Sequence, residues 1–263
     1  MILLNSISRL QFTRVLGLIL VAGIVLCFII TEPIAQQNDY HGFSNDHVKF
    51  QLENFWNVIS NLPFIFLGIG GLIWWSKLIR FFKKNNLDLT KRWLCLEPLF
   101  FIGILAIGLG STYYHINPTL STLFWDRLPM ALVFSTLFVI IIRDFVSYEL
   151  SSKLKTPIIV SSLLSVVYWI VSEHFGRGDL RPYVLVQFLP MLCIPYFLWL
   201  NNYRKKTKLT WFAVGFYFLA KLAEYFDYQI FELTSFIAGH PIKHFLAAVA
   251  MVYVIKHIKK QVQ

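Results

Sequence analysis

Eight long apolar runs constrain this chain more than any other feature, because together they occupy most of its length. A helix that crosses a bilayer needs about 20 mostly apolar residues, and backbone groups in lipid must find their hydrogen bonds within the segment. The runs therefore predict an all-α integral membrane protein with eight spanning helices. They lie at residues 12–31, 55–76, 94–115, 119–142, 157–174, 182–200, 209–227 and 238–256.

The composition agrees with a membrane protein and excludes an ordinary soluble domain. Only 14% of the 263 residues are charged, and the mean hydropathy is +0.60, whereas soluble domains carry about 25% charged residues. A net charge of +10 would indicate nucleic-acid binding in a soluble protein, but in a membrane protein Lys and Arg gather in the cytoplasmic segments. We expect the lipid bilayer around the helices and no nucleic-acid partner.

The basic residues alternate between the segments that separate the runs. Most of the 24 Lys and Arg lie before residue 15 or within 77–92, 143–155, 204–208 and 256–260, and the intervening segments hold few. Such alternation predicts an even number of spans with both termini in the cytoplasm.

The predicted organisation is an added helix followed by one membrane domain. No small-x-small cleavage site follows the first run, so we expect it to be retained as an anchor rather than removed as a signal peptide. The segments are an N-terminal membrane helix at 1–31, an extracytoplasmic loop at 32–52, a seven-helix core at 53–257 and a cytoplasmic tail at 258–263.

The three cysteines are Cys27, Cys95 and Cys193, each inside or beside an apolar run. This number and spacing form neither a disulfide framework nor a CxxC metal knuckle. They predict small, buried apolar side chains.

Six ionisable residues lie at helix ends that the span count places near the outer face of the membrane. Such residues at membrane depth are costly and are commonly functional. They are His115, Asp126, Glu224, Asp227, His240 and His244.

Three of these residues form the pattern of a metal site. His240 and His244 are four residues apart, so they share one helix face and can chelate one metal ion. With His115 as a third ligand, the set resembles a catalytic zinc site, which keeps its fourth position open. Zinc in such a site lowers the pKa of its bound water to about 7. The alternative is three interfacial histidines without a metal.

Two further residues predict hydrolytic chemistry beside the metal. Asp126 is a candidate general base, and Ser111, one turn before His115, is a candidate ligand for water or for a substrate carbonyl. Alternatively, Asp126 pairs with Arg127 or Lys243, and Ser111 bonds a carbonyl of its own helix.

Other polar groups have simpler interpretations. Glu224 and Asp227 either support the metal ligands or form ion pairs with residues such as Lys221. The amides and hydroxyl at Asn57, Ser60 and Asn61 either bond between helices or line a cavity. The remaining histidines lie outside this set. His41 and His47 are expected to be solvated loop residues, and His174 lacks a partner at ligand spacing. His257 is also outside the set.

The loop before residue 55 carries three acidic residues that could hold Ca²⁺. They are Asp39, Asp46 and Glu53. A merely solvated loop is the alternative.

Four stretches resemble the alkaline ceramidase family, within a superfamily of seven-helix membrane hydrolases that includes adiponectin and progestin receptor-like proteins. They are "ENFWNVISN", "GSTYYHINPTLSTLFWDRLPM", "AKLAEYFD" and "GHPIKHFLAAVAMV". The resemblance extends from residue 53 to 256, and its most specific part is Ser-x-x-x-His, an Asp eleven residues later and the distant His-x-x-x-His.

The resemblance implies an activity and a site. The seven-helix core would be the second to eighth helices, and the reaction would be hydrolysis of the ceramide amide bond to a sphingoid base and a fatty acid. The zinc ligands would be His115, His240 and His244, with Ser111 and Asp126 as the family's serine and aspartate and Tyr183 near the oxyanion. The acidic calcium-binding stretch ahead of the core in animal members is not visible here.

The leading hypothesis from the sequence is a zinc-dependent intramembrane amidase that acts on a ceramide-like lipid. Such a substrate stays in the bilayer, since each buried CH₂ is worth about 0.8 kcal/mol. Two alternatives are a receptor or sensor of the same fold with a structural zinc, and a transporter or proton relay that uses Asp126, Glu224 and Asp227.

Overall fold

The computed structural model describes residues 22, 23, 26, 30–44, 52–86, 96–200 and 204–262. Most of the helix expected at 12–31 lies outside the described residues, as do Cys27, Asp46, His47 and Cys95, so those predictions stay untested. The elements are η1 (Asn38–His41), α2 (Phe55–Ile59), α3 (Leu62–Lys84), α4 (Leu96–Ile116), α5 (Leu120–Phe145), α6 (Tyr148–His174), α7 (Arg181–Leu200), α8 (Arg204–Tyr225), α9 (Asp227–Thr234) and α10 (Gly239–Val262).

Six helices among the described residues are long and apolar enough to cross a membrane. They are Phe55–Lys84, Leu96–Ile116, Leu120–Phe145, Tyr148–His174, Arg181–Leu200 and Gly239–Gln261. This confirms an all-helical, multi-pass architecture, while the count of seven spans plus one stays a prediction. Helix α8 is long enough but is not among the six, because basic residues crowd its first turns and Lys221 and Glu224 lie near its end.

Several helices extend beyond the predicted runs, among them α3, which ends at Lys84 instead of 76, and α10, which ends at Val262 instead of 256. Helix α6 begins at Tyr148 instead of 157, because Ser147 caps it by accepting a hydrogen bond from the Leu150 N–H. The charged residues of its first turns, which suggested a loop, are helical. The run at 209–227 ends at Tyr225, where the chain bends into the short helix α9.

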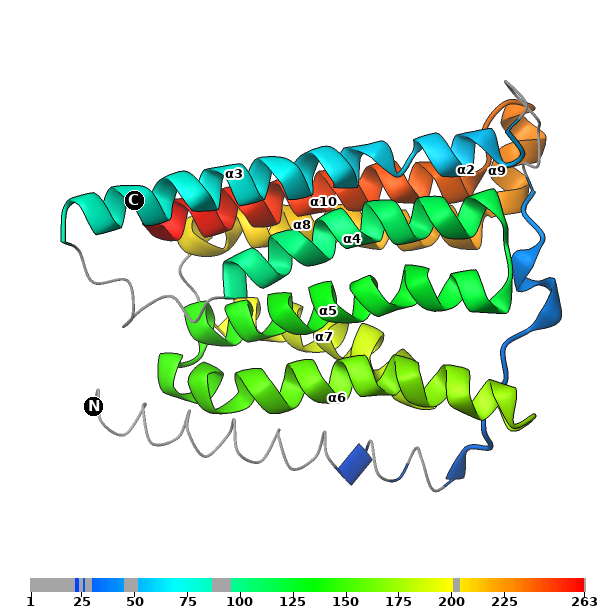
Figure 1. Cartoon of the computed structure of the whole chain (residues 1–263), viewed down its shortest axis with the longest axis horizontal. Coiled ribbons are helices and arrows are strands. Elements are labelled where there is room, and N and C mark those ends of the chain that lie inside the picture. Colours follow the sequence, from blue (N-terminus) through cyan, green and yellow to red (C-terminus); the bar gives the residue numbers. More distant parts are fainter. Residues whose placement is uncertain are drawn as a thin grey trace.

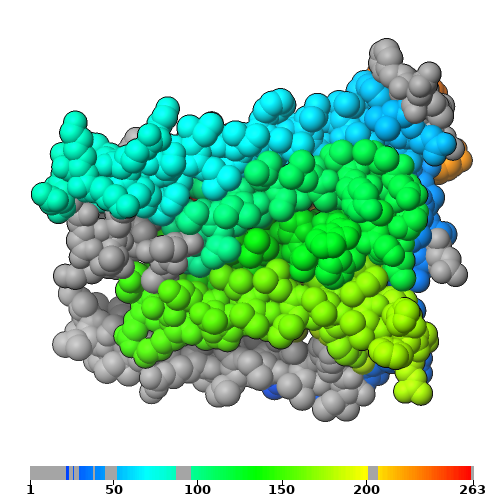
Figure 2. Space-filling model, viewed as in Figure 1, coloured from blue at the N-terminus to red at the C-terminus, as the bar shows by residue number. Residues whose placement is uncertain are grey.

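The long helices lie side by side in one bundle (Figure 1). Helix α4 packs between α3 and α5, α5 also packs on α6 and α7, and α10 packs along α8 and α3. Side chains of α3, α4 and α6 lie on the face of the bundle that Figure 2 shows. Large exposed apolar residues such as Phe66, Leu109 and Leu164 give the helices a surface suited to lipid.

The end of the bundle that carries α2 and α9 brings together three helix termini (Figure 1). Helix α4 ends there, and α5 begins after a capping box in which Thr119 Oγ1 accepts the Thr122 N–H at 3.2 Å. Helix α10 also begins there. A Cβ at Gly239 would collide with the Ala223 carbonyl oxygen, and one at Gly110 with that of Trp125. The two glycines therefore allow the helix contacts on which the site depends.

A buried ionic cluster lies at the other end of the bundle. Arg143 Nε is 2.8 Å from Asp144 Oδ1, a second guanidinium nitrogen bonds Glu97, and His257 Nε2 is 2.9 Å from Asp144 Oδ2. We assigned Arg143 to a cytoplasmic segment, but it is buried within α5. Its burial is possible because Glu97 and Asp144 supply the partners of opposite sign that a buried charge requires.

Candidate metal centre

The three predicted histidine ligands converge at the end of the bundle. Their candidate ligand atoms all lie within 4.8 Å of one another. The ring of His115 is 5.0 Å from that of His240 and 5.2 Å from that of His244, centroid to centroid. His115 and His244 are buried and His240 is half-buried. The set is close enough to bind one metal ion.

The chemistry of this donor set suits a metal. Imidazole nitrogens bind Zn²⁺ and several other transition metals. His115 is 1% exposed, and its Nδ1 has no hydrogen-bond partner among the described residues. Buried polar atoms are normally paired, so an unpaired ring nitrogen beside two other imidazoles fits a site whose remaining partner is a cation.

Ser60 orients His244 from the turn between α2 and α3. Its Oγ donates to the Asn57 carbonyl oxygen at 3.0 Å and lies 2.7 Å from His244 Nδ1. A hydroxyl has one hydrogen, so donation to Asn57 makes Ser60 the acceptor of the His244 Nδ1–H. This tautomer leaves Nε2 of His244 with a free lone pair for a metal.

We expect Ser60→Ala to weaken zinc affinity by about 10- to 100-fold, because outer partners fix the tautomer and orientation of ligating histidines. Competition against a chelator of known affinity measures the change. Ser76→Ala is the matched control, since Ser76 is a serine of α3 that bonds only within its own helix. Equal affinities in the two variants would contradict the role given to Ser60.

Other contacts hold the remaining two histidines. The Asp227 carboxylate accepts the backbone N–H of His240 at 2.5 Å, which anchors the start of α10. The Asn54 amide donates to the His115 carbonyl oxygen at 3.3 Å. The ring of Phe43 packs against both imidazoles, at 4.8 Å from His115 and 5.2 Å from His240.

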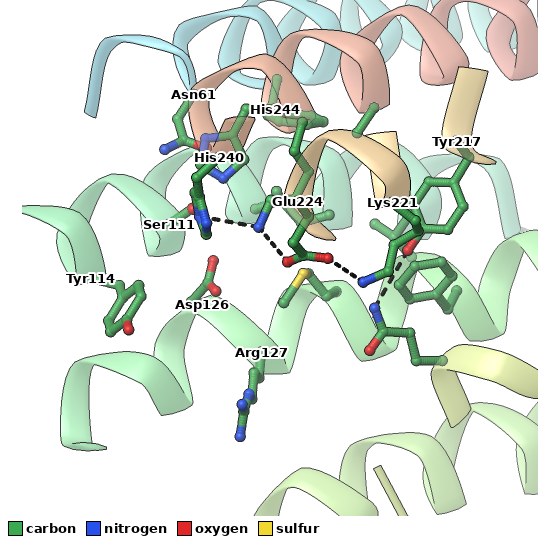
Figure 3. A pocket seen from close by; sticks show the side chains of 18 of the residues that line it. Asn61, Ser111, Tyr114, Asp126, Arg127, Tyr217, Lys221, Glu224, His240 and His244 are labelled. Carbon is green, nitrogen blue, oxygen red and sulfur yellow. Dashed lines mark hydrogen bonds and ion pairs between the residues drawn. The ribbon is translucent and has the colours of Figure 1, made fainter. Parts of the chain in front are cut away.

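Asp126 and Ser111 lie beside the histidines, as the spacing predicts. Figure 3 shows the Asp126 carboxylate pointing toward Ser111 and His240, and Ser111 lines the same cavity as Asp126. The alternative in which Asp126 pairs with Arg127 or Lys243 is not supported, because neither pair is formed in the described part of the chain.

Glu224 connects two lysines to the site. It forms ion pairs with Lys221 and, at 2.9 Å, with Lys243 (Figure 3). Lys243 Nζ is in turn 3.1 Å from His240 Nε2. Both sequence interpretations of Glu224 therefore hold, since it is an ion-pair partner and also reaches a candidate ligand through Lys243.

The candidate metal centre opens into a cavity of about 310 Å³. Ser111, Asp126, His240 and His244 line it, together with Tyr183, whose hydroxyl is buried and lacks a partner among the described residues. Tyr183 thus shares the cavity with the other predicted site residues.

Residues 31–44, here named the strap, run across the end of the bundle (Figure 1), and Tyr40 of the strap lines the cavity. His41 Nδ1 lies 3.1 Å from the Tyr114 hydroxyl, so His41 is half-buried and not the solvated residue that we predicted. Burial, with a smaller effect of the Arg127 charge, lowers the pKa of the His41 imidazole. The neutral ring therefore predominates at pH 7.

From the sequence, we considered Ser60 only as a helix-bonding or cavity-lining group, and Arg127 and Lys243 only as possible partners of Asp126. The contacts of Ser60 with His244 and of Lys243 with His240 were not predicted. For Lys243 the available signal was its position between the two histidines of α10.

The remaining predictions concern groups away from the histidines. Cys193 is buried, as expected. The calcium prediction for Asp39, Asp46 and Glu53 stays untested, because Asp46 lies outside the described residues.

No model of a known protein family matches the chain, and no curated protein matches it either.

Proposed function

We propose that this protein is a zinc-dependent intramembrane hydrolase that cleaves the amide bond of a ceramide or a related N-acyl lipid. The observation that carries the proposal is the cluster of His115, His240 and His244 beside a cavity that Ser111 and Asp126 line together with His240 and His244. A purely structural zinc site is closed by four protein ligands and has no use for an adjacent carboxylate and hydroxyl. The resemblance to alkaline ceramidases adds the reaction and the lipid class.

Each residue has a chemical role in this proposal. The three histidines would hold zinc, which supplies Lewis acidity toward the amide carbonyl and acidifies water. Asp126 accepts a proton from the attacking water and returns it to the leaving nitrogen. The water oxygen bonds to the carbonyl carbon as the C–N bond breaks, which yields a fatty acid and an amine. Ser111 orients Asp126 or donates to the carbonyl oxygen, and Tyr183 is a second candidate donor.

The shape of the interior suits a lipid. A second, mostly apolar cavity of about 230 Å³ lies between α5, α7, α8 and α10, and Phe134, Tyr217 and Met251 line both cavities. An acyl chain in the second cavity would place its carbonyl in the first. Burial of that chain provides binding energy without polar contacts.

The proposed topology has eight spans, formed by α8, the six apolar helices and the N-terminal helix. Both termini would be cytoplasmic, and the metal centre would lie near the extracytoplasmic face, in agreement with the distribution of Lys and Arg.

Release of fatty acid from a ceramide by the detergent-purified chain tests this function. We expect turnover by the wild type and none above background for Asp126→Ala or His240→Ala. Turnover that both variants retain would refute the proposal. Zinc binding without hydrolysis of any N-acyl lipid would favour the receptor alternative.

A further inference from the structure

Arg127 follows Asp126 in α5, but its side chain points the opposite way (Figure 3). It is only 5% exposed and lines the same cavity. Its guanidinium carbon lies 4.3 Å from the ring centroid of Trp169, 5.2 Å from that of Tyr40 and 5.3 Å from that of Tyr183. Three aromatic rings therefore surround this cation.

The hydrogen-bond donors of Arg127 are not satisfied by these rings. No carboxylate among the described residues forms an ion pair with Arg127, and its Nη1 is buried without a hydrogen-bond partner. Aromatic stacking stabilises the charge through the face of the guanidinium but leaves the N–H groups at its edge free. A buried charge without a partner is costly, so stacking alone does not account for an arginine here.

Tyr183 adds a second unused donor to the same wall. It is 4% exposed, its hydroxyl has no partner among the described residues, and its ring contacts Arg127. An arginine fork beside a hydroxyl is a common arrangement for binding a carboxylate or a phosphate.

The charges around the cavity favour an anion at this position. Its lining contains the cations Arg127, Lys221 and Lys243 and the acids Asp126 and Glu224. Both lysines pair with Glu224. Arg127 is therefore the cation of the cavity lining that lacks a direct acidic partner in the described part of the chain.

We infer that Arg127 and Tyr183 form a subsite for an anionic oxygen group, a carboxylate or a phosphate, on the amine portion of the N-acyl lipid. This inference rests on the proposed function. Asp126 lies between the histidines and Arg127 (Figure 3), so the amide bond would sit at Asp126 and the anionic group beyond it. The preferred substrate would then be an acidic N-acyl lipid, and an uncharged ceramide would bind less well.

Three lipids with the same acyl chain test the subsite. N-lauroylethanolamine is neutral, N-lauroylglycine carries a carboxylate, and N-lauroyl-O-phosphoethanolamine carries a phosphate. We expect the purified full chain to prefer at least one anionic lipid by about 10- to 100-fold in kcat/KM and in binding, the range given by a charge-assisted hydrogen bond. The anionic lipid with the higher kcat/KM identifies the group, carboxylate or phosphate, that the subsite prefers.

Variants then assign the preference to these side chains. Arg127→Met should bring the ratio of kcat/KM for the anionic lipid to kcat/KM for the neutral lipid to about one, and Tyr183→Phe should reduce this ratio. Arg80→Met, at an arginine of α3 near the other end of the bundle, is the matched control and should keep it. Equal use of all three lipids by the wild type, or an unchanged preference in Arg127→Met, would overturn the inference.

Binding separates this inference from the proposed function. His115→Ala should bind the anionic lipids preferentially but hydrolyse none of them. Tighter anionic binding with no hydrolysis by the wild type would count against the proposed reaction and retain the subsite. If Arg127→Met does not fold, the inference is tested by the ratio of kcat/KM for the anionic lipid to that for the neutral lipid, compared between the wild type and Tyr183→Phe. An equal ratio in the two proteins would contradict the inference.

Discussion

We expect His240→Ala to lose bound zinc and to lose lipid amide hydrolysis by at least about 1,000-fold. The substitution leaves two ring nitrogens and destroys the chelate that His240 and His244 form on one face of α10. A catalytic metal stabilises the transition state by several kcal/mol. Because about 1.36 kcal/mol corresponds to a tenfold change in rate, loss of the metal lowers the rate of hydrolysis by this factor. Metal content per chain and fatty acid release, measured on the same preparation, check both parts.

The control for this variant is His174→Ala. His174 is exposed at the end of α6 and lies outside the centre, so zinc content and turnover should match the wild type. A single intact site would hold about one zinc per chain. If a folded His240→Ala protein still holds that amount, His240 is excluded as a ligand.

We expect Asp126→Asn to retain zinc but to hydrolyse lipid amides about 10²- to 10⁴-fold more slowly, which is the usual contribution of a general base. Asparagine has nearly the shape of aspartate and cannot accept the proton of water. The pH dependence of kcat should also lose the limb that belongs to this carboxylate. Steady-state kinetics across pH, with metal analysis, measure these effects.

Asp39→Asn provides the matched control, because Asp39 is an exposed aspartate of the strap. Its activity should equal that of the wild type. An Asp126→Asn enzyme with normal rate and pH profile would remove Asp126 from the chemistry.

The sequence allowed one part of the metal centre to be predicted, namely that the three histidines lie at the same end of the bundle. His115 ends one helix and His240 begins another, and an even number of predicted crossings between them places both ends on one face. The four-residue spacing places His244 on the same helix face as His240. The approach of the ligand atoms to within 4.8 Å depends on how the helices pack, which could not be read from the sequence.

The supporting residues could not be predicted, because their roles depend on contacts between helices. Ser60 reaches His244 across 184 residues of sequence, and nothing in its local pattern gives that distance. Arg127 was read as a possible partner of Asp126, but neighbours in a helix point in different directions. The burial of Arg143 likewise depends on Glu97, which belongs to another helix.

The strap has a consequence for how material would reach the interior. Its backbone is fixed to the α6–α7 turn, where Leu180 N–H donates to the Ile34 carbonyl at 2.8 Å and Gln36 N–H to Glu173 at 2.6 Å. Its rings cover Arg127 and two of the histidines. In the proposed hydrolase, a long-chain lipid would therefore have to enter from the side of the bundle instead of through this covered end. Turnover would then depend on the order and thickness of the surrounding bilayer.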